Sequence, residues 1–295
     1  MLALLSRCLP RAAKQHLFGA FVAWRTWTNP LLVPLGNALS ELDMALRPRH
    51  HAARLDAAIG AGIAWFARRE AWEFDAVWLL GRVVDVRDEP ALVVAEQAYQ
   101  AYRSAWRDRY LRLFDPAYHE DVHGASRLKM PWRPDPIHKM MRKVLHADRL
   151  GLREPFLDQL CALEDGGSYG TTHVLVGAHY LRQFSAIAPA ALDRVVASCI
   201  PTLLRRQRVD RIGDIYAERV VVLQLIGRHD LVRPAWIARM VRGQQRDGGW
   251  YYKVPPLRVT SEQHPSALAL AALIRYRSQR RLPRADSPSP HGAPP

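Results

Sequence analysis

Apolar side chains recur every three or four residues along most of the chain, which is the period of an α-helix with one buried face. One such stripe comprises Leu55, Ile59, Ile63 and Phe66, and a second lies within residues 92–113. Further helices are predicted at 136–149, 153–163, 171–184, 189–207, 212–227, 234–245 and 264–278. No run of alternating β-branched residues indicates strands, so the pattern predicts an all-α protein.

Prolines mark several helix ends. Pro189 and Pro234 stand in the first turns of predicted helices, where a missing N–H is tolerated, and Pro265 has the same place after His264. Pro201 lies inside the helix predicted at 189–207, and we expect it to kink or break that helix.

The chain divides into three regions. Residues 1–45 form a basic and aromatic N-terminal segment, residues 46–280 a single helical domain, and residues 281–295 a tail rich in Pro and Ser for which we expect disorder. Two irregular, proline-containing loops at 114–135 and 250–263 interrupt the domain. Long loops of this kind in a compact domain are often functional.

The predicted helices form pairs with a shared turn. A polar or Gly-containing turn ends the first helix, and the second begins with polar residues and then becomes apolar. The clearest turns are Asp165-Gly166-Gly167 and Asp247-Gly248-Gly249, and weaker units occur near 203–218 and 63–81. Repeated helix pairs indicate a closed or stacked helical array.

One repeat carries a family resemblance. Gln244-Gln245-Arg246-Asp247-Gly248-Gly249-Trp250, followed by His264-x-Ser266-Ala267-Leu268-Ala269-Leu270, resembles the repeat of terpenoid cyclases and protein prenyltransferase β-subunits, and the unit from Asp165 to His173 is similar. The resemblance covers roughly residues 50–280 and implies an α/α toroid, in which an inner ring of helices lies within an outer ring. Four to five helix pairs are visible rather than six, so an incomplete ring is the alternative. It also implies that Gln244, Asp247 and Trp250 staple adjacent hairpins.

The catalytic motifs of that superfamily are absent from this sequence. The Asp-x-Asp-Asp acid of class II cyclases is absent. His173 resembles the zinc-binding histidine of the prenyltransferases, but glycine stands where their Asp-x-Cys motif has its thiolate. A tetrahedral zinc site would therefore be incomplete. Cys161 and Cys199 lack the settings of the zinc-binding cysteines in lanthionine-cyclase-like toroids, so we expect no metal and no cofactor.

Ionisable and polar side chains stand at the predicted starts of the inner helices, which in a toroid face one end of a central cavity. The candidates for proton transfer are His173, Asp214, Glu218 and His264, and the candidates for lining the ligand are Asp75, Tyr169, Thr172, Tyr216, Trp250 and Tyr251. Asp214 and Glu218 are four residues apart and share a helix face. Carboxylates and imidazoles that converge in a half-apolar pocket can transfer protons or hold a polar ligand. The alternative is that Asp75, Thr172 and Asp214 cap their helices.

A separate motif, His119-Glu120-Asp121-Val122-His123, matches the H-E-x-x-H zinc signature of metalloproteases. That chemistry needs both histidines on one helix, and Pro116 and Gly124 bracket the motif. A surface loop is therefore the favoured interpretation.

Charge first suggests a nucleic-acid partner, because 42 Lys+Arg against 28 Asp+Glu give a net charge of +14. The excess lies largely at the ends: residues 1–50 hold six basic and two acidic residues, and residues 271–295 hold five and one. Nearly all of it is arginine, as a GC-rich coding bias would produce, and no zinc-finger, RRM or basic-zipper pattern occurs. We therefore do not expect nucleic-acid binding.

The N-terminal segment allows three interpretations. Arg7, Arg11 and Lys14 precede a short apolar run at 17–24, as in a weak signal peptide, but no small-x-small cleavage site follows. Aromatic residues interleaved with basic ones would also suit a helix on a membrane surface. The third interpretation is a first helix that packs on the domain. Export of the protein is therefore one hypothesis, and a cytoplasmic location is the favoured one. The apolar runs of the chain are too short for a polytopic membrane protein.

Two functional hypotheses follow for the toroid. The first is an enzyme that acts on a small or lipid-like substrate by acid/base catalysis at the inner-helix ends. The second is a non-catalytic binding or scaffold protein whose cavity holds a peptide, glycan or lipid. The clustered ionisable residues favour the first, and the missing catalytic motifs favour the second. The sequence does not indicate an oligomeric state.

Overall fold

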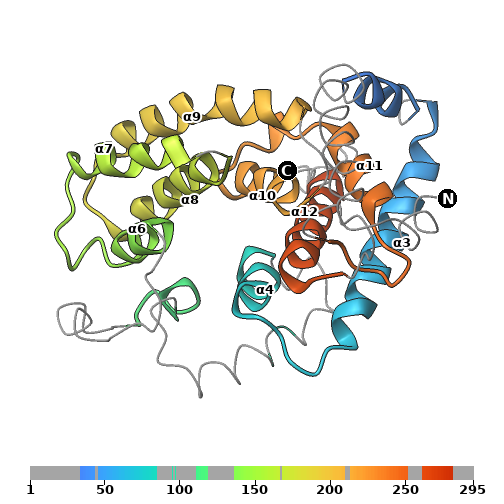
Figure 1. The fold of residues 1–295 in the computed structure, drawn as a ribbon, viewed down its shortest axis with the longest axis horizontal. Coiled ribbons are helices and arrows are strands. Elements are labelled where there is room, and N and C mark those ends of the chain that lie inside the picture. Colours follow the sequence, from blue (N-terminus) through green and yellow to red (C-terminus); the bar gives the residue numbers. More distant parts are fainter. Residues whose placement is uncertain are drawn as a thin grey trace, which may run out of the picture.

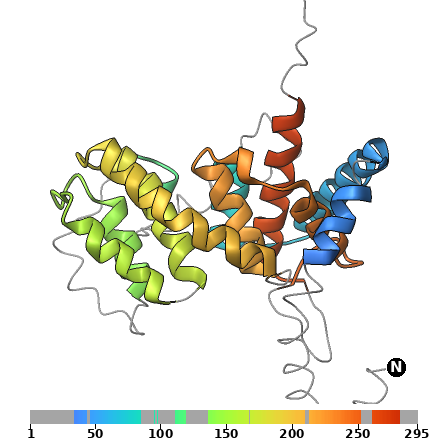
Figure 2. The ribbon, with the colours of Figure 1, turned by 90° about the horizontal axis from the view of Figure 1, so that it is seen from above.

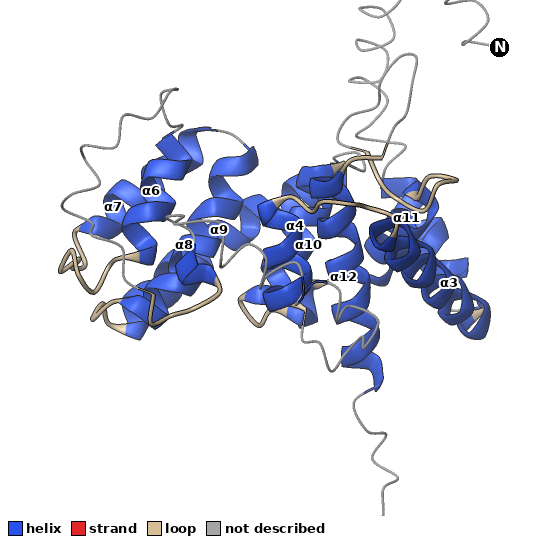
Figure 3. Ribbon diagram, turned by 90° about the horizontal axis from the view of Figure 1, so that it is seen from below, coloured by secondary structure: helices blue, strands red, loops and turns tan. Residues whose placement is uncertain are grey.

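The computed structural model describes residues 34–43, 46–84, 95, 97, 111–118, 136–166, 168–209, 213–251 and 261–281. Every regular element within these residues is a helix, which confirms the all-α prediction (Figure 3). Apart from helices, the described backbone has an isolated antiparallel bridge between Trp250 and Glu262. No described helix is long and apolar enough to cross a membrane.

The α-helices are α3 (Pro48–Ala67), α4 (Phe74–Trp78), α6 (Pro136–Leu145), α7 (Phe156–Cys161), α8 (Ser168–Phe184), α9 (Pro189–Val209), α10 (Asp214–Leu225), α11 (Pro234–Gly243) and α12 (Gln263–Arg281). A π-helical turn, η1 (Leu79–Val83), continues α4, and 3₁₀ turns lie at η4 (Leu111–Leu113), η6 (Ala162–Gly166) and η7 (His229–Leu231). Residues 34–43 are also helical. Figure 1 shows α6 to α9 at one end of the molecule, α3 and α11 at the other, and α10 and α12 between them, and Figure 2 shows the same order at right angles.

Three of these helices run in the same direction, as two sets of contacts show. At their beginnings, Asp75 of α4 is paired with His264 of α12. At their far ends, Arg275 of α12 donates to the Val83 carbonyl of η1 and, at 3.1 Å, to the Gln224 carbonyl of α10. The α4–η1 segment and α12 are therefore parallel neighbours. α10 has the same direction, because the charge of Asp214, its first residue, acts on His264 at the beginning of α12.

The other helices connect and support this parallel set. α9 links α8 to α10 and contacts both, and α11 links α10 to α12 and contacts α12 and α3. α8 contacts α10, and α12 contacts both α10 and α4. The indole N–H of Trp78 in α4 also donates to the Tyr180 hydroxyl of α8, at 3.2 Å. The beginnings of α4, α8, α10 and α12 can thus meet in one region.

The turn between α11 and α12 is fastened to α3, far away in the sequence. The Gln244 amide donates to the Ala58 carbonyl of α3 at 2.8 Å. The Asp247 carboxylate accepts from the Ser261 hydroxyl at 2.7 Å and from the Trp65 indole of α3 at 3.2 Å. Gln244 and Asp247 thus tie this turn to α3.

We expected Pro201 to kink or break its helix, and it does not break it. α9 is continuous from Pro189 to Val209, and Pro201 lies on its exposed side. A proline inside a helix costs about 3 kcal/mol through a lost hydrogen bond and a steric clash. Cys199, Ile200 and Leu203 beside it are buried, and burial of each such side chain contributes about 1.5–3 kcal/mol. Core packing therefore outweighs the local penalty.

An ion pair that no sequence pattern predicts joins η4 to the turn after α6. Arg112 is 4% exposed, and its guanidinium donates to both carboxylate oxygens of Asp148 at 2.6 Å and to the Leu145 carbonyl at 2.8 Å. It also lies over the Phe184 ring, 4.4 Å from the ring centre. The hydrogen bonds from Arg112 outweigh burial and lower the pKa of Asp148 to about 2.

We expect Asp148→Asn to lower the free energy of unfolding by about 1–2 kcal/mol at pH 7, because it leaves the buried Arg112 without its anion while Asp148 itself is partly exposed. Because the pKa of Asp148 is lower in the folded protein, its ionised carboxyl stabilises the fold at pH values above the ordinary pKa of 3.8. This contribution is lost as the pH falls toward 2. Urea unfolding between pH 2 and pH 7 measures it. A difference between the two proteins that does not shrink below pH 4 contradicts the prediction.

Several predictions lie outside the described residues. The His119–His123 motif, the signal and membrane-surface interpretations of residues 1–33, most of the predicted stripe at 92–113 and the tail after residue 281 are among them. They stay predictions.

Candidate functional site

Glu218 of α10 joins two side chains from the beginning of α8. The Thr172 hydroxyl donates to Glu218 Oε1 at 2.5 Å, and His173 Nδ1 lies 3.6 Å from the same oxygen. His173 Nδ1 is also 2.8 Å from the Tyr169 carbonyl oxygen. A carbonyl oxygen only accepts, so Nδ1 carries the hydrogen. Nε2 of His173 is left with no hydrogen bond to any residue that the structure describes, and its lone pair can accept a proton.

Asp75 and His264 form a second histidine–carboxylate pair, between α4 and α12, with Nδ1 of His264 against Oδ2 of Asp75. Burial raises the pKa of Asp75, but the hydrogen bond and charge of His264 and two backbone N–H groups outweigh it, so the pKa lies below its ordinary value. The carboxyl is therefore ionised at neutral pH, and Nδ1 of His264 donates to it. Nε2 is then the His264 nitrogen that can exchange a proton.

The two pairs share one electrostatic environment. Burial lowers the pKa of His264, but the Asp75 hydrogen bond and the charges of Asp75, Glu218 and Asp214 outweigh it and hold the pKa above its ordinary value. Charges act this strongly only at short range, because solvent and salt screen distant ones. The beginnings of α4, α8, α10 and α12 thus bring all four candidates for proton transfer into one neighbourhood.

Asp214 is the least satisfied member of this group. It is the first residue of α10 and only 4% exposed, and its Oδ2 has no hydrogen-bond partner within the part of the chain that the structure describes. Burial and the charge of Glu218 raise its pKa. A buried carboxylate oxygen without a donor costs free energy, and a bound group that supplies a hydrogen bond removes that cost.

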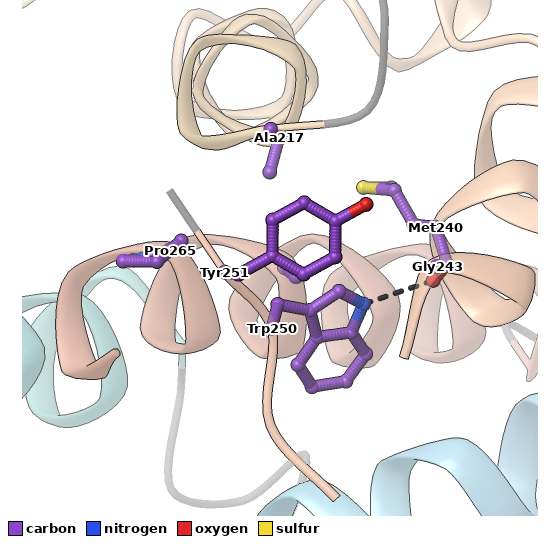
Figure 4. Close-up of a pocket in the computed structure, with 8 residues that line it drawn as sticks. Ala217, Met240, Gly243, Trp250, Tyr251 and Pro265 are labelled. Carbon is purple, nitrogen blue, oxygen red and sulfur yellow. Dashed lines mark hydrogen bonds between the residues drawn. The ribbon is translucent and has the colours of Figure 1, made fainter. Parts of the chain in front are cut away.

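A small apolar pocket adjoins the group. Its lining residues are Gly213, Ala217, Met240, Gly243, Trp250, Tyr251, Pro265 and Ala269. Figure 4 shows Tyr251 beside Trp250, with Ala217 of α10, Met240 of α11 and Pro265 of α12 around them. It has room for about one water molecule. Gly213 and Pro265 are the chain neighbours of Asp214 and His264, so the pocket and the ionisable group are adjacent.

The predicted ligand-lining residues have different places. Asp75 and Thr172 are hydrogen-bonded to His264 and Glu218, Tyr169 offers its carbonyl to His173, and Trp250 and Tyr251 line the pocket. Tyr216 lies elsewhere: it is fully buried, and its hydroxyl accepts from Arg239 of α11 at 3.4 Å. Burial raises the pKa of Tyr216 to about 12, although the nearby arginines lower it.

The capping alternative holds only in part. α8 begins at Ser168, so Thr172 is its fifth residue and does not cap it. Asp75 and Asp214 do lie in the first turns of their helices, where a negative charge is favoured by the helix dipole. Neither makes a side-chain cap at the preceding position, because the N-cap residues are Glu73 and Gly213.

No family model, curated protein or solved structure matches this chain. Within the described residues, no three His, Cys, Asp or Glu side chains are grouped so as to hold a metal ion. Sequence reasoning named the members of the site but missed that Asp75 and His264 are direct partners, because 189 residues separate them.

We expect Asp75→Asn to lower the free energy of unfolding by about 1 kcal/mol, as for a partly exposed ion pair, and to do so mainly between about pH 4 and pH 6.5. His264 has a raised pKa, so its contribution is complete below its ordinary value of 6.5 and is lost as the pH rises through the folded pKa. Asp75 has a lowered pKa, so its contribution is present above 3.8 and is lost at lower pH.

Urea unfolding across pH 3 to pH 9 tests this window. Asp56→Asn is the matched control, because Asp56 pairs with Arg277, which stays charged throughout. Its effect should persist at pH 9. An Asp75→Asn difference that is equally large at pH 9 contradicts the assignment of the charge to His264.

Proposed function

We propose that this chain is an α/α toroid that binds a small or lipid-like substrate by a polar group at the beginnings of its inner helices, and that His264 and His173 transfer protons there. The inner helices are α4, α8, α10 and α12, and α3, α9 and α11 belong to the outer layer. The parallel course of α4, α10 and α12, with return helices between neighbours, supports this arrangement. So does the Gly-Gly turn that is stapled to α3.

One observation carries the proposal. Two histidine–carboxylate pairs come from four helix beginnings, and Glu218 and His264 act electrostatically on Asp214, whose buried Oδ2 lacks a partner among the described residues. In each pair Nδ1 is engaged and Nε2 is the nitrogen that can exchange a proton. His264, whose pKa is raised, is the group to donate a proton to a ligand, and Nε2 of His173, which has a lone pair, is the group to accept one. Glu218 and Asp75 orient these rings.

A non-catalytic binding or scaffold protein for a peptide, glycan or lipid is the second candidate function. The observation that favours it is the size of the adjoining pocket, which has room for about one water molecule. Such a protein would use the same polar group for recognition alone.

A thermal-shift screen of small polar compounds tests the proposal. We expect at least one compound class to raise the melting temperature of the wild type, and we expect that shift to disappear in His173→Ala, Glu218→Ala and His264→Ala. His50→Ala, an exposed histidine of α3, is the matched control and should keep the shift. If each site variant melts at lower temperature and no compound shifts the wild type, these residues are structural and the proposal fails.

A further inference from the structure

Resting on the proposed function, we propose that the polar group recognised at this site is a primary ammonium carried on a short apolar chain. The site would thus bind a cation although the chain as a whole carries a net charge of +14. The ammonium would lie against Asp214 and Glu218, and the apolar chain against Tyr251 and Pro265.

The charge balance favours a cation. Asp75 and His264 neutralise one another, which leaves the carboxylates of Asp214 and Glu218. Exposed Glu73 and Glu262 add negative charge beside this group. Their closeness to it is seen in the pKa of Glu73, which is raised mainly by burial and further by the charges of Asp75 and Glu262. The N-termini of α4, α8, α10 and α12 contribute about half a positive charge each, which offsets Asp214 and Glu218, so the sum stays negative through Glu73 and Glu262.

Among the described residues, no lysine or arginine of the chain neutralises this negative charge. The leading charges that shift the pKa values of Glu73, Asp75, Asp214 and His264 come from other carboxylates and from His264, and none comes from Lys or Arg. Elsewhere in the described chain, exposed Asp148 pairs with Arg112. Within the described residues the ion-pair partners of Glu218 and Asp75 are histidines, and no lysine or arginine pairs with Asp214.

Hydrogen bonding narrows the cation to one with N–H groups. Oδ2 of Asp214 is buried and lacks a donor, and an ionised carboxylate oxygen can only accept. A primary ammonium has three donors, so it can serve Asp214 and Glu218 together, whereas a quaternary ammonium has none. Charge-assisted hydrogen bonds of this kind are about twice as strong as neutral ones.

The neighbouring surface suits an apolar chain. Gly213, Ala217, Pro265 and Ala269 line it and carry no polar side-chain atom. The Tyr251 ring lies between Pro265 and Met240, and Ala217 lies near the same ring (Figure 4). The enclosed space has room for about one water molecule, so the alkyl chain would lie along this apolar wall and not inside the pocket.

Four matched probes test the proposal on the full chain: n-butylammonium, tetramethylammonium, 1-butanol and butyrate. Calorimetry at pH 7 gives the dissociation constants, and the NMR signals of the His264 ring and the Trp250 indole report binding at the site. We expect n-butylammonium to bind at least about ten-fold more tightly than the other three, since a hydrogen bond to a charged group is worth about that factor or more.

Asp214→Asn should weaken n-butylammonium at least about ten-fold, because it removes the charge that the ammonium faces. Asp158→Asn, an exposed acid of α7, makes the same chemical change away from the site and should leave the affinity as it is. If Asp214→Asn does not fold, Glu218→Gln provides the same comparison.

The outcomes separate this inference from the proposed function. Binding of butyrate or 1-butanol at least as tight as that of n-butylammonium, with the His264 signals shifted, overturns the ammonium assignment and leaves the site in place. Absence of binding by all four probes also overturns the assignment. Failure of the proposed function would show itself differently, as a His264 pKa that does not respond to Asp214→Asn in the protein without any probe.

Discussion

Gly248→Ala is expected to lower the free energy of unfolding by about 2–4 kcal/mol, because two penalties add at this position. Gly248 has a φ of +97°, which side-chain-bearing residues rarely adopt. A Cβ there would lie 2.5 Å from the Ala61 carbonyl oxygen of α3, and that atom belongs to backbone that cannot simply turn aside. The turn between α11 and α12 would have to move away from α3.

Gly227→Ala is the matched control. Gly227 has a φ of +78°, but a Cβ there would meet nothing within 4 Å. Only the conformational penalty applies, and we expect a loss of about 1 kcal/mol. Urea unfolding of both variants at pH 7 measures the difference. Equal losses would mean that the Gly248 turn does not need its close contact with α3.

The second large effect is expected for Trp250→Ala, which should lower the free energy of unfolding by about 3–5 kcal/mol. Trp250 is 3% exposed, its indole N–H donates to the Met240 carbonyl at 2.9 Å, and its ring packs against Gly62 of α3. Its removal would leave a cavity where α3, α11 and α12 meet, and rigid backbone around that cavity limits its collapse.

Trp250→Phe separates the two parts of that effect. It keeps most of the ring volume and leaves the Met240 carbonyl without its donor, so we expect a loss of about 1–2 kcal/mol. Thermal and urea unfolding should rank the two variants in this order. A Trp250→Ala loss below about 1 kcal/mol would show that this side chain does not hold the three helices together.

The period of the apolar residues was sufficient to predict most helices, because each helix buries one face against its neighbours. α8 begins three residues before the apolar period predicts, since Ser168, Tyr169 and Gly170 have no apolar signal. Position 170 needs glycine for a tertiary reason, because a Cβ there would lie 1.8 Å from the Leu163 carbonyl oxygen. Pro201 does not end α9, because its neighbours are buried in the core.

The site was predictable as a set of residues and not as a set of contacts. Polar residues at helix starts are visible in sequence, and Thr172, His173 and Glu218 do meet, as do Asp75 and His264. Tyr216 follows the same pattern but faces Arg239, because two residues along a helix turn a side chain to the other face. Helix packing decides which carboxylate pairs with which histidine, and the spacing of residues in the sequence does not predict that packing.

The central claim is that His264 titrates within the shared field of Asp75, Asp214 and Glu218. NMR titration of the His264 ring in the wild type, Asp214→Asn and Glu218→Gln tests it most directly, with Asp158→Asn as the control. The wild-type pKa should lie above 6.5 and fall in both site variants, since each removes a nearby negative charge, and the control should not change it. A wild-type pKa at or below 6.5 that neither variant alters would contradict the account.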